Sequence, residues 1–378
     1  MPQLNFYGKL TIIKYMNDFI VCATRSMRNY ASQVITYLSK YLCFSRIIEH
    51  INGLDLLNTD SFADGEMEVS VNSSIRGKDV VLFSSSARNE AGVNVDEAKI
   101  ELYHAIDALK RCQVKKIIVF EPFISCSRSD RTTRRSSVGL WVHLKTLYSL
   151  GVSHVVTFQL HSDKSKTMLD PSVCAIDDIP ALTLLKKYLC DTYIKSIDFL
   201  EQEVRRNWAF CSVDAGGEKL TRIFANSFGA PLVVAHKQRD YSKKNTIESI
   251  NILSAEPVEG KSLWIVDDMV DTAGSIQTLI NALSPLKPKE INIIAVHALF
   301  SSPAAERLDT LFRNDLLNRM IVTDTVYCPP SIQQSIPNLE IVHSAELAAK
   351  IIKAIINNES MSNLLRPFDA SVYLSNGK

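Results

Sequence analysis

The chain has 378 residues, of which 46% are hydrophobic and 22% charged, and its formal net charge is +1. This length favours two domains, and a composition so rich in apolar residues excludes a disordered chain. The nearly balanced charge excludes a general electrostatic attraction to nucleic acid or to an anionic membrane. No apolar run reaches the length of about 18 residues that a membrane span needs, so we expect no transmembrane helix.

The eight cysteines are scattered along the chain and form no CxxC pair. Several of them, such as Cys112 and Cys190, lie inside apolar segments. We therefore expect reduced core thiols, and neither a disulfide framework nor a zinc site. Lys9, Lys14 and Asp18 interrupt the apolar N-terminal stretch, which makes it a poor signal peptide. Together these features predict a cytoplasmic protein.

Strand-like and helix-like segments alternate along the chain. In the first half, strands are predicted at 18–23, 78–85, 115–123 and 154–160, and helices at 27–42, 95–112 and 138–150. In the second half, strands are predicted at 208–213, 231–237, 263–266, 290–299, 319–325 and 339–344. Helices are predicted there at 181–190, 217–228 and 345–356, with one more after 263–266. The polar segment 238–249 has no apolar periodicity and is predicted to be an exposed loop.

This alternation predicts parallel sheets with helices on both faces. Two such units of similar size fit the length better than one very large sheet. In α/β folds the loops at the carboxyl ends of the strands carry the ligand-binding groups. Residues that directly follow a predicted strand are therefore the candidates for function.

The stretch "SLWIVDDMVDTAGSIQTLI", residues 262–280, carries the strongest chemical pattern. Asp267 and Asp268 end an apolar strand, and the turn 271–275 leads directly into a helix. Backbone amides and the positive end of a helix at such a turn suit a phosphate. The two acids suit sugar hydroxyls or a metal ion, so the stretch suggests a site for a sugar phosphate. The alternative is an ordinary strand, turn and helix with acidic caps.

Further stretches bring reactive residue types to strand ends or turns: "FADGE" (62–66), "SCSRSDRTTRR" (125–135), "TFQLHS" (157–162) and "SVDAGGEK" (212–219). A basic cluster such as the second can clamp a polyphosphate, although such runs are more often solvated loops. A single histidine such as His161 is more often structural than catalytic. In the fourth stretch, Gly216 and Gly217 allow a ligand to approach the backbone closely.

Together, and in this order, these stretches resemble ribose-phosphate diphosphokinase, also called phosphoribosyl pyrophosphate synthetase. The resemblance extends from about residue 18 to 365 and includes "RGKDV" (76–80), "HKQR" (236–239), "HALFSSPA" (297–304) and "ESMSNLL" (359–365). It implies an α/β fold of two phosphoribosyltransferase-like domains, 18–165 and 166–365, each a mainly parallel sheet flanked by helices. It also implies transfer of the β,γ-diphosphoryl group of ATP to the anomeric hydroxyl of ribose 5-phosphate, with Mg²⁺ as cofactor and AMP as a product.

The resemblance assigns roles residue by residue. Ribose 5-phosphate would be held in the second domain by Asp267, Asp268, Asp271, Thr272, Ala273, Gly274 and Ser275. The diphosphate loop would be Asp214, Ala215, Gly216 and Gly217. ATP would be bound by Arg128, Asp130 and His161, and by a neighbouring subunit's Phe62, Asp64 and Glu66. The metal would be held by His161 and Asp214, and the catalytic groups would be Lys237, Arg239 and His161.

The assignment of Phe62 to a neighbouring subunit implies a homo-oligomer, between a dimer and a hexamer. Ser129 stands where the family usually has glutamine, Gln159 where it has aspartate, and Ser302 where it has glycine. The first two differences leave open a second interpretation, a non-catalytic regulatory paralogue. A phosphoribosyltransferase, which shares the 265–275 motif, is a third, and a nucleic-acid binder built on the basic cluster is a fourth.

Overall fold

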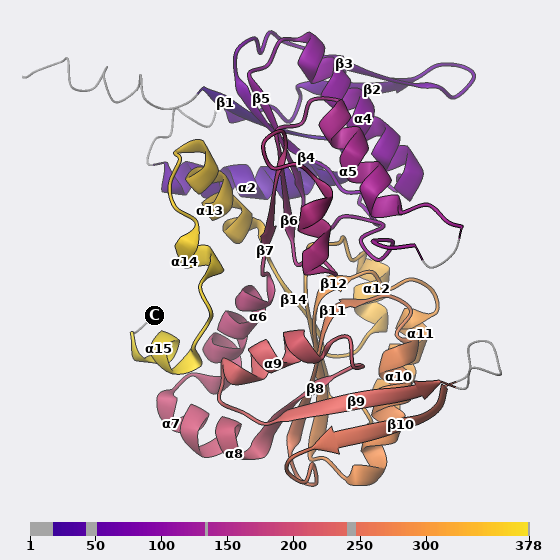
Figure 1. Ribbon diagram of the computed structural model, residues 1–378, viewed down its shortest axis with the longest axis vertical. Coiled ribbons are helices and arrows are strands. Elements are labelled where there is room, and N and C mark those ends of the chain that lie inside the picture. The colour runs from indigo at the N-terminus through magenta and orange to yellow at the C-terminus, as the bar shows by residue number, and fades with distance from the viewer. Residues whose placement is uncertain (1–17, 43–50, 133–134, 240–246, 377–378) are drawn as a thin grey trace, which may run out of the picture. The chain divides into compact units, whose positions relative to one another are not determined.

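The structure, a computed structural model, describes residues 18–42, 51–132, 135–239 and 247–376 (Figure 1). Within these residues, contacts divide the chain into two compact units. The first extends to Ile179 and also includes Ala345–Leu365, whereas the second comprises Pro180–Ser344 and the residues from Arg366 onward. The expected boundary between residues 165 and 166 falls inside the short helix η2 (Asp163–Met168) of the first unit.

The first unit contains a parallel sheet. Among the described residues its strands are ordered β1-β4-β5-β6-β7, and every neighbouring pair is parallel. The strands are β1 (Phe19–Ala23), β4 (Asp79–Phe83), β5 (Lys116–Glu121), β6 (His154–Phe158) and β7 (Ala175–Ile179). The first four follow predicted apolar runs. β7 does not, because Asp177 and Asp178 interrupt its sequence.

Helices cover both faces of this sheet (Figure 1). Alternate strand residues face opposite ways, so Leu82 packs in the core formed with α4 (Val95–Arg111) and α5 (Gly139–Ser149), whereas Phe83 packs on Tyr30. Tyr30 belongs to α2 (Arg28–Tyr41), which follows the short helix η1 (Arg25–Met27). α13 (Ala345–Ile356) packs on α2, where the Tyr41 hydroxyl donates a hydrogen bond to Glu346. α13 is therefore part of the first unit, and α14 (Ser362–Leu365) follows it.

A separate antiparallel hairpin of β2 (Leu57–Ser61) and β3 (Met67–Val71) belongs to the same unit. The sequence pattern predicts only a turn here, because most residues of both strands are polar or half-exposed. The turn itself is the "FADGE" segment. The amide of Phe62 donates to the carbonyl of Glu66 at 2.8 Å, and Gly65 has φ +92°. A left-handed residue of this kind favours glycine, so the segment is a defined hairpin tip.

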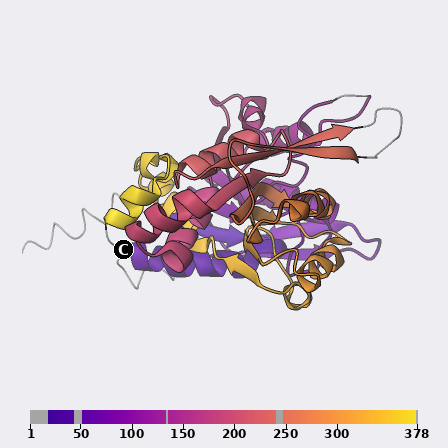
Figure 2. The same cartoon turned by 90° about the horizontal axis from the view of Figure 1, so that it is seen from below.

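The second unit contains a larger, mixed sheet. Over its described residues the strand order is β10-β9-β8-β11-β12-β13-β14. All neighbouring pairs are parallel except β10 with β9, which lie antiparallel at one edge (Figure 2). The strands are β8 (Trp208–Ser212), β9 (Leu232–Arg239), β10 (Ile247–Ser254), β11 (Ser262–Val270), β12 (Glu290–Ala298), β13 (Arg319–Thr323) and β14 (Leu339–Val342).

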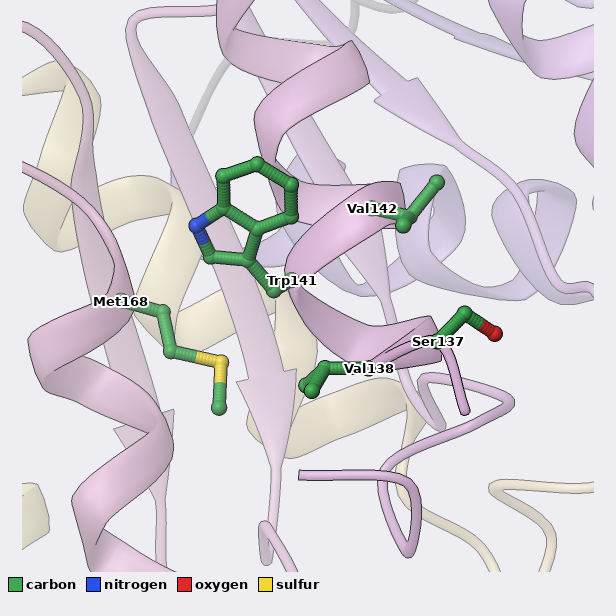
Figure 3. Close-up of a pocket in the computed structure, with 5 residues that line it drawn as sticks. All are labelled: Ser137, Val138, Trp141, Val142 and Met168. Carbon is green, nitrogen blue, oxygen red and sulfur yellow. The ribbon is translucent and has the colours of Figure 1, made fainter. Parts of the chain in front are cut away.

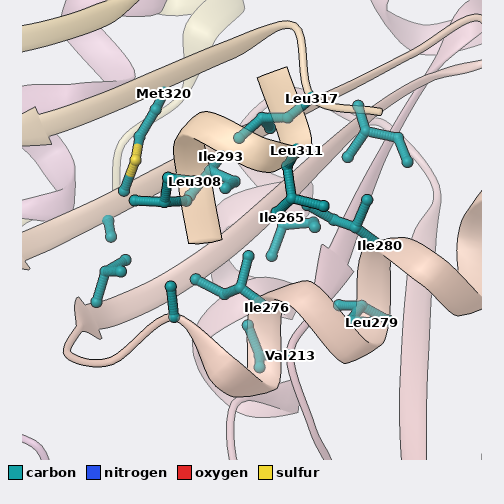
Figure 4. Packing of buried hydrophobic residues seen from close by; sticks show 14 of the residues in the cluster. Val213, Ile265, Ile276, Leu279, Ile280, Ile293, Leu308, Leu311, Leu317 and Met320 are labelled. Carbon is teal, nitrogen blue, oxygen red and sulfur yellow. The ribbon is translucent and has the colours of Figure 1, made fainter. Parts of the chain in front are cut away.

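The helices of the second unit pack on its sheet through apolar faces. Figure 4 shows Ile276, Leu279 and Ile280 of α10 against Ile265 of β11 and Ile293 of β12. All five side chains are buried. Besides α10 (Gly274–Leu283), the unit contains α6 (Leu182–Leu189), α9 (Glu218–Asn226), η5 (Ser284–Leu286), α11 (Ala304–Arg313), α12 (Pro330–Ser335) and α15 (Ala370–Ser375).

Between α6 and β8 lies a helical segment made of η3 (Cys190–Ile194), α7 (Ile197–Phe199), η4 (Leu200–Val204) and α8 (Arg205–Asn207). The C-terminal helix α15 is attached to this segment. The Tyr373 hydroxyl donates to Asp191 at 3.1 Å, and the Arg205 guanidinium donates to the Ser371 hydroxyl at 2.9 Å. The last described residues are thus part of the second unit.

The predicted α/β class, with mainly parallel sheets flanked by helices, is confirmed. The predicted exposed loop at 238–249 is wrong at both ends, because 238–239 end β9 and 247–249 begin β10, which pair through their backbones. Residues 240–246 lie outside the described residues. All seven cysteines in the described ranges are free thiols. Within the same ranges, no helix is both long and apolar enough to span a membrane.

Candidate active site

Two strand-to-helix turns meet at one edge of the second sheet. β8 and β11 are parallel neighbours, so their carboxyl ends share an edge. The turn after β8 contains residues 213–217 and leads into α9, and the turn after β11 contains 271–273 and leads into α10. Loops at the carboxyl ends of parallel strands are where α/β proteins bind ligands. The candidate diphosphate loop and sugar-phosphate turn are thus brought together.

The sugar-phosphate turn ends in an unusual backbone conformation. Ala273, the N-cap residue of α10, has φ 58° and ψ 8°, a left-handed conformation that non-glycine residues seldom adopt. Its methyl side chain cannot accept a hydrogen bond from the first helical amides. These amides therefore face the turn without the side-chain cap that most helices have. A strained residue at a helix start with uncapped amides is a geometry suited to an anion.

Asp267 and Asp268 lie within β11, which continues to Val270 and does not end at Val266 as the sequence predicts. The amide of Asp268 donates to Oδ1 of Asp267 at 2.9 Å. Burial raises the pKa of Asp267 well above its usual range, and the negative charges of Asp268 and Asp214 raise it further. The charges of Asp268, on the same strand, and of Asp214, in the turn after β8, therefore both act on Asp267. Such a group of carboxylates attracts cations and hydroxyl donors.

Asp214 folds back onto its own loop. Its Oδ1 accepts hydrogen bonds from the amides of Gly216 at 2.9 Å and Gly217 at 3.1 Å. A β-carbon on Gly216 would lie 3.1 Å from this oxygen, so the glycine permits the close approach. Thr221 of α9 contacts the sheet, because its hydroxyl lies 3.4 Å from the carbonyl oxygen of Val266 on β11. The backbone amides of Gly216 and Gly217 and the carboxylate of Asp214 are therefore adjacent in this loop.

Arg239 is the last residue of β9, and Lys237 lies two residues before it. They pair with Ile247 and Ile250 of β10, respectively. Their side chains lie outside the described residues. The catalytic role that the sequence resemblance gives them stays a prediction.

In the first unit, the predicted nucleotide residues lie on two elements. Phe62, Asp64 and Glu66 form the tip of the β2–β3 hairpin, where the Phe62 ring is 56% exposed. Such exposure of a phenylalanine leaves its ring available to a ligand or to another chain. Arg128 and Asp130 lie in the loop between β5 and α5, where Arg128 is exposed and Asp130 half-buried.

Ser129 fixes the loop that carries Arg128 and Asp130. Its hydroxyl accepts a hydrogen bond from the amide of Gly139 at 2.9 Å, and its carbonyl accepts one from Leu140 at 3.2 Å. The N-cap residue of α5, Val138, has no polar side chain, so Ser129 supplies the cap from a distance. The serine at this position thus has a defined structural role.

His161 follows β6 and is exposed. Because β5 and β6 are parallel neighbours, His161 and the Arg128 loop lie at the same edge of the first sheet. Over residues 18–42, 51–132, 135–239 and 247–376, no three His, Cys, Asp or Glu side chains are grouped closely enough to hold a metal ion. The predicted pair of metal ligands, His161 and Asp214, lies on different units.

Comparisons with known proteins identify the family. The model of the N-terminal domain of ribose phosphate pyrophosphokinase matches residues 19–151, and that of the phosphoribosyl transferase domain matches 189–312. Ribose-phosphate pyrophosphokinase from Fusobacterium nucleatum is 31% identical over 304 residues, which are 80% of this chain and 88% of the relative. The chain belongs to the ribose-phosphate pyrophosphokinase family.

Other members of the family agree with this result. Ribose-phosphate pyrophosphokinase from Mycoplasma pneumoniae is 30% identical over 334 residues, 88% of this chain and 94% of the relative. The crystal structure of phosphoribosylpyrophosphate synthetase from Mycobacterium smegmatis has a TM-score of 0.74 and 26% identity, covering 90% of this chain and all of that one. Ribose-phosphate pyrophosphokinases are transferases, so the chain belongs to a family of enzymes.

Arg307, on α11, lies at the sugar-phosphate turn, although the sequence pattern does not predict it as a site residue. Its Nη1 donates a hydrogen bond to the carbonyl of Thr272 at 2.8 Å, and it would lie 3.1 Å from a β-carbon on Gly274. A guanidinium beside the sugar-phosphate turn adds positive charge where an anion is expected. The residues are 35 positions apart in the chain. No local pattern could have connected them.

The structure also contains an apolar pocket of about 460 Å³ in the first unit (Figure 3). It is lined by Trp141 and Val142 on α5, by Ser137 and Val138 before it, and by Met168 on η2. Its lining is almost wholly apolar. None of the five lining residues is charged, and none is a predicted site residue.

Proposed function

We propose that this chain is itself a ribose-phosphate diphosphokinase. It would transfer the β,γ-diphosphoryl group of ATP to the anomeric hydroxyl of ribose 5-phosphate, giving phosphoribosyl pyrophosphate and AMP. The observation that carries this proposal is the pair of turns that follow β8 and β11. One offers glycine amides and Asp214, and the other offers uncapped helix amides beside Asp267 and Asp268.

Ribose 5-phosphate fits the turn after β11. Its phosphate would accept hydrogen bonds from the amides of 272–275, with Arg307 nearby to balance the charge. The carboxylates of Asp267 and Asp268 would accept hydrogen bonds from the ribose hydroxyls. The raised pKa of Asp267 indicates a carboxylate that gains from a donor or a cation beside it. The side chain of Asp271 would point away from the phosphate and cap the turn.

The residues present also fit a magnesium ion. Mg²⁺ prefers oxygen ligands and is usually held by one or two carboxylates together with substrate phosphates. Asp214 and its neighbour Asp267 provide such carboxylates, which repel one another without a cation. His161 would contact the metal and the ATP phosphates, as the resemblance implies. Bound magnesium would neutralise negative charge on the transferring phosphates.

The chain's own groups would act mainly by position and charge. In phosphoryl transfer the protein forms few covalent bonds itself. Catalysis therefore depends mainly on alignment of the two substrates and on stabilisation of the developing charge. The amides of Gly216 and Gly217, which Asp214 occupies here, would be free to bind the diphosphate once Asp214 turns to the metal. Lys237, Arg239 and His161 would stabilise the charge that develops on the transferring group.

ATP would bind through Arg128 and Asp130 of one subunit and the hairpin tip of another. Phe62 would stack on the adenine, and Asp64 and Glu66 would contact its polar edge. The exposed Phe62 ring supports this assignment. The active form would then be a homo-oligomer, between a dimer and a hexamer, in the cytoplasm. A fully active monomer in sedimentation would contradict this part of the proposal.

The test is an assay of AMP release from ATP by the purified full chain with Mg²⁺, with and without ribose 5-phosphate. We expect AMP only when ribose 5-phosphate is present. A non-catalytic paralogue would release no AMP under either condition. A phosphoribosyltransferase would instead consume phosphoribosyl pyrophosphate in the presence of a nucleobase.

A further inference from the structure

The turn that carries His161 is tied to one side chain on the neighbouring strand. The amide of Leu160 donates a hydrogen bond to Oδ1 of Asp178 at 2.9 Å. Oδ2 of the same carboxylate lies 3.4 Å from the ammonium nitrogen of Lys166 on η2. His161 therefore lies in a short arc of chain that is attached at both ends to Asp178.

The start of this arc is also fixed by the backbone. The amide of Gln159 donates to the carbonyl of Ile179 at 3.0 Å, which ends the pairing of β6 with β7. Gln159 itself has φ 45°, in the left-handed region that non-glycine residues seldom adopt. The chain therefore turns sharply out of β6 directly before Leu160. A turn of this kind persists only where its surroundings hold it.

The Asp178 carboxylate is well placed to stabilise the turn that follows β6. Its side chain is only 9% exposed, whereas that of Lys166 is 39% exposed. Burial raises the pKa of Asp178, while the Leu160 amide and the Lys166 charge act in the opposite direction. A hydrogen bond from an amide to a carboxylate in such a place is stronger than one between neutral groups. The carboxylate of the neighbouring residue Asp177 lies 2.8 Å from the ring nitrogen Nε2 of His154.

We propose that Asp178 is a positioning residue that sets the place of His161 for the nucleotide. This inference rests on the proposed function, because it gives His161 a role toward ATP. The residue at 159 is an amide, so the turn has no carboxylate of its own directly after β6. Asp178 supplies a carboxylate from the adjacent strand. This carboxylate contacts Leu160 before His161 and Lys166 after it.

The experiment compares Asp178→Ala and Asp178→Asn, with Asp177→Asn as the matched control. Asparagine keeps an oxygen that accepts the Leu160 amide but gives up the charge toward Lys166, whereas alanine loses both contacts. Hydrogen exchange at the Leu160 amide and the His161 ring signals in NMR are measured on the full chain, beside its melting temperature. Steady-state kcat and the KM values for ATP and ribose 5-phosphate are measured on the same proteins.

We expect exchange at Leu160 to rise about 10- to 100-fold in Asp178→Ala and to change little in Asp178→Asn. The His161 signals should shift in the alanine variant only. Because small misplacements of a reacting group are costly, kcat should fall about 10-fold or more in Asp178→Ala while the KM for ribose 5-phosphate stays unchanged. Asp178→Asn should keep most of the wild-type kcat, and Asp177→Asn should have the same kcat and KM values as the wild type.

The inference is wrong if Leu160 exchange and the His161 signals are unchanged in Asp178→Ala. It is also wrong if that variant melts earlier but its folded form keeps the wild-type kcat, since Asp178 would then only stabilise the fold. If the wild type releases no AMP from ATP and ribose 5-phosphate, the proposed function fails. Exchange at Leu160 and the His161 signals still decide in that case whether Asp178 positions His161.

Discussion

Oδ1 of Asp214 lies 2.9 Å from the backbone nitrogen of Gly216 and accepts its hydrogen bond. The same oxygen accepts the Gly217 amide, so this carboxylate orders the loop that we assign to the diphosphate. Its negative charge also acts on Asp267 on the adjacent strand. Asp214 therefore has two separable properties: an acceptor oxygen for the loop and a charge for a cation.

Asp214→Asn should separate these properties. Asparagine keeps an acceptor oxygen, so the melting temperature should change by less than about 3 °C, which corresponds to about 1 kcal/mol in a chain of this size. The loss of charge should raise the Mg²⁺ concentration needed for half-maximal activity by about 10-fold or more. Asp214→Ala, as the comparison, loses both the acceptor oxygen and the charge, so it should lower the melting temperature and also raise the Mg²⁺ concentration needed. An unchanged magnesium titration of Asp214→Asn would restrict this residue to a structural role.

Asp267→Asn should stabilise the folded protein at neutral pH while reducing its activity. The folded pKa of Asp267 is raised above its ordinary value of 3.8, so its contribution to stability is complete below that value and is lost as pH rises through the folded pKa. Asparagine does not ionise, so the variant does not lose this stability as the pH rises. In magnesium-free denaturant titrations, the difference in unfolding free energy between variant and wild type should grow with pH, by about 1.4 kcal/mol per pH unit within that window.

A pH-independent difference would show that Asp267 is ionised at its ordinary pKa. Adding Mg²⁺ should stabilise the wild type more than Asp267→Asn, since a bound cation offsets the repulsion among the carboxylates. Equal stabilisation of both would mean that the ion binds elsewhere.

Gly274→Val should block ribose 5-phosphate. Gly274 is the first residue of α10, and a β-carbon there would lie 3.1 Å from Nη1 of Arg307, the end of a flexible side chain. The fold can accommodate this contact, so the variant should remain folded. The added side chain would occupy the space where phosphate approaches the backbone, and affinity for ribose 5-phosphate should fall by about 100-fold or more. An unchanged affinity in calorimetry would contradict the assignment of this turn.

Ser129→Ala should loosen the loop that carries Arg128. Removal of the hydroxyl leaves the Gly139 amide without its 2.9 Å acceptor, at a cost of about 1 kcal/mol in unfolding free energy. The KM for ATP should rise by several-fold while that for ribose 5-phosphate stays unchanged. Ser136→Ala, an exposed serine in the same loop, is the control. If the two variants behave alike, the cap has no role in binding ATP.

Local patterns in the sequence predict most of the fold, and long-range pairing explains what they miss. The apolar run of β11 stops at Val266, but the strand continues because Asp267 and Val270 pair with Ala295 and Ala298 of β12. A single strand's composition does not reveal that its neighbour supplies the hydrogen bonds. β2 is hard to predict for the same reason: its sequence is polar and largely exposed, and only its pairing with β3 identifies it as a strand.

In the candidate site, too, local patterns predict some residues and long-range packing places the others. Residues that follow one strand, such as Asp214 or Gly274, can be found from spacing and composition. Arg307 and Asp178 cannot, because each reaches a turn from a different element, 35 and 18 positions away in sequence from its partner. Their contacts exist only once neighbouring strands and helices are packed.

The central claim is that the chain transfers a diphosphoryl group intact. The most direct measurement is phosphorus NMR of the purified chain with ATP, Mg²⁺ and ribose 5-phosphate. We predict equal amounts of AMP and of a sugar that carries a diphosphate on its anomeric carbon, with the 5-phosphate unchanged. Formation of ADP and a singly phosphorylated anomeric carbon, or no consumption of ATP, would contradict the account.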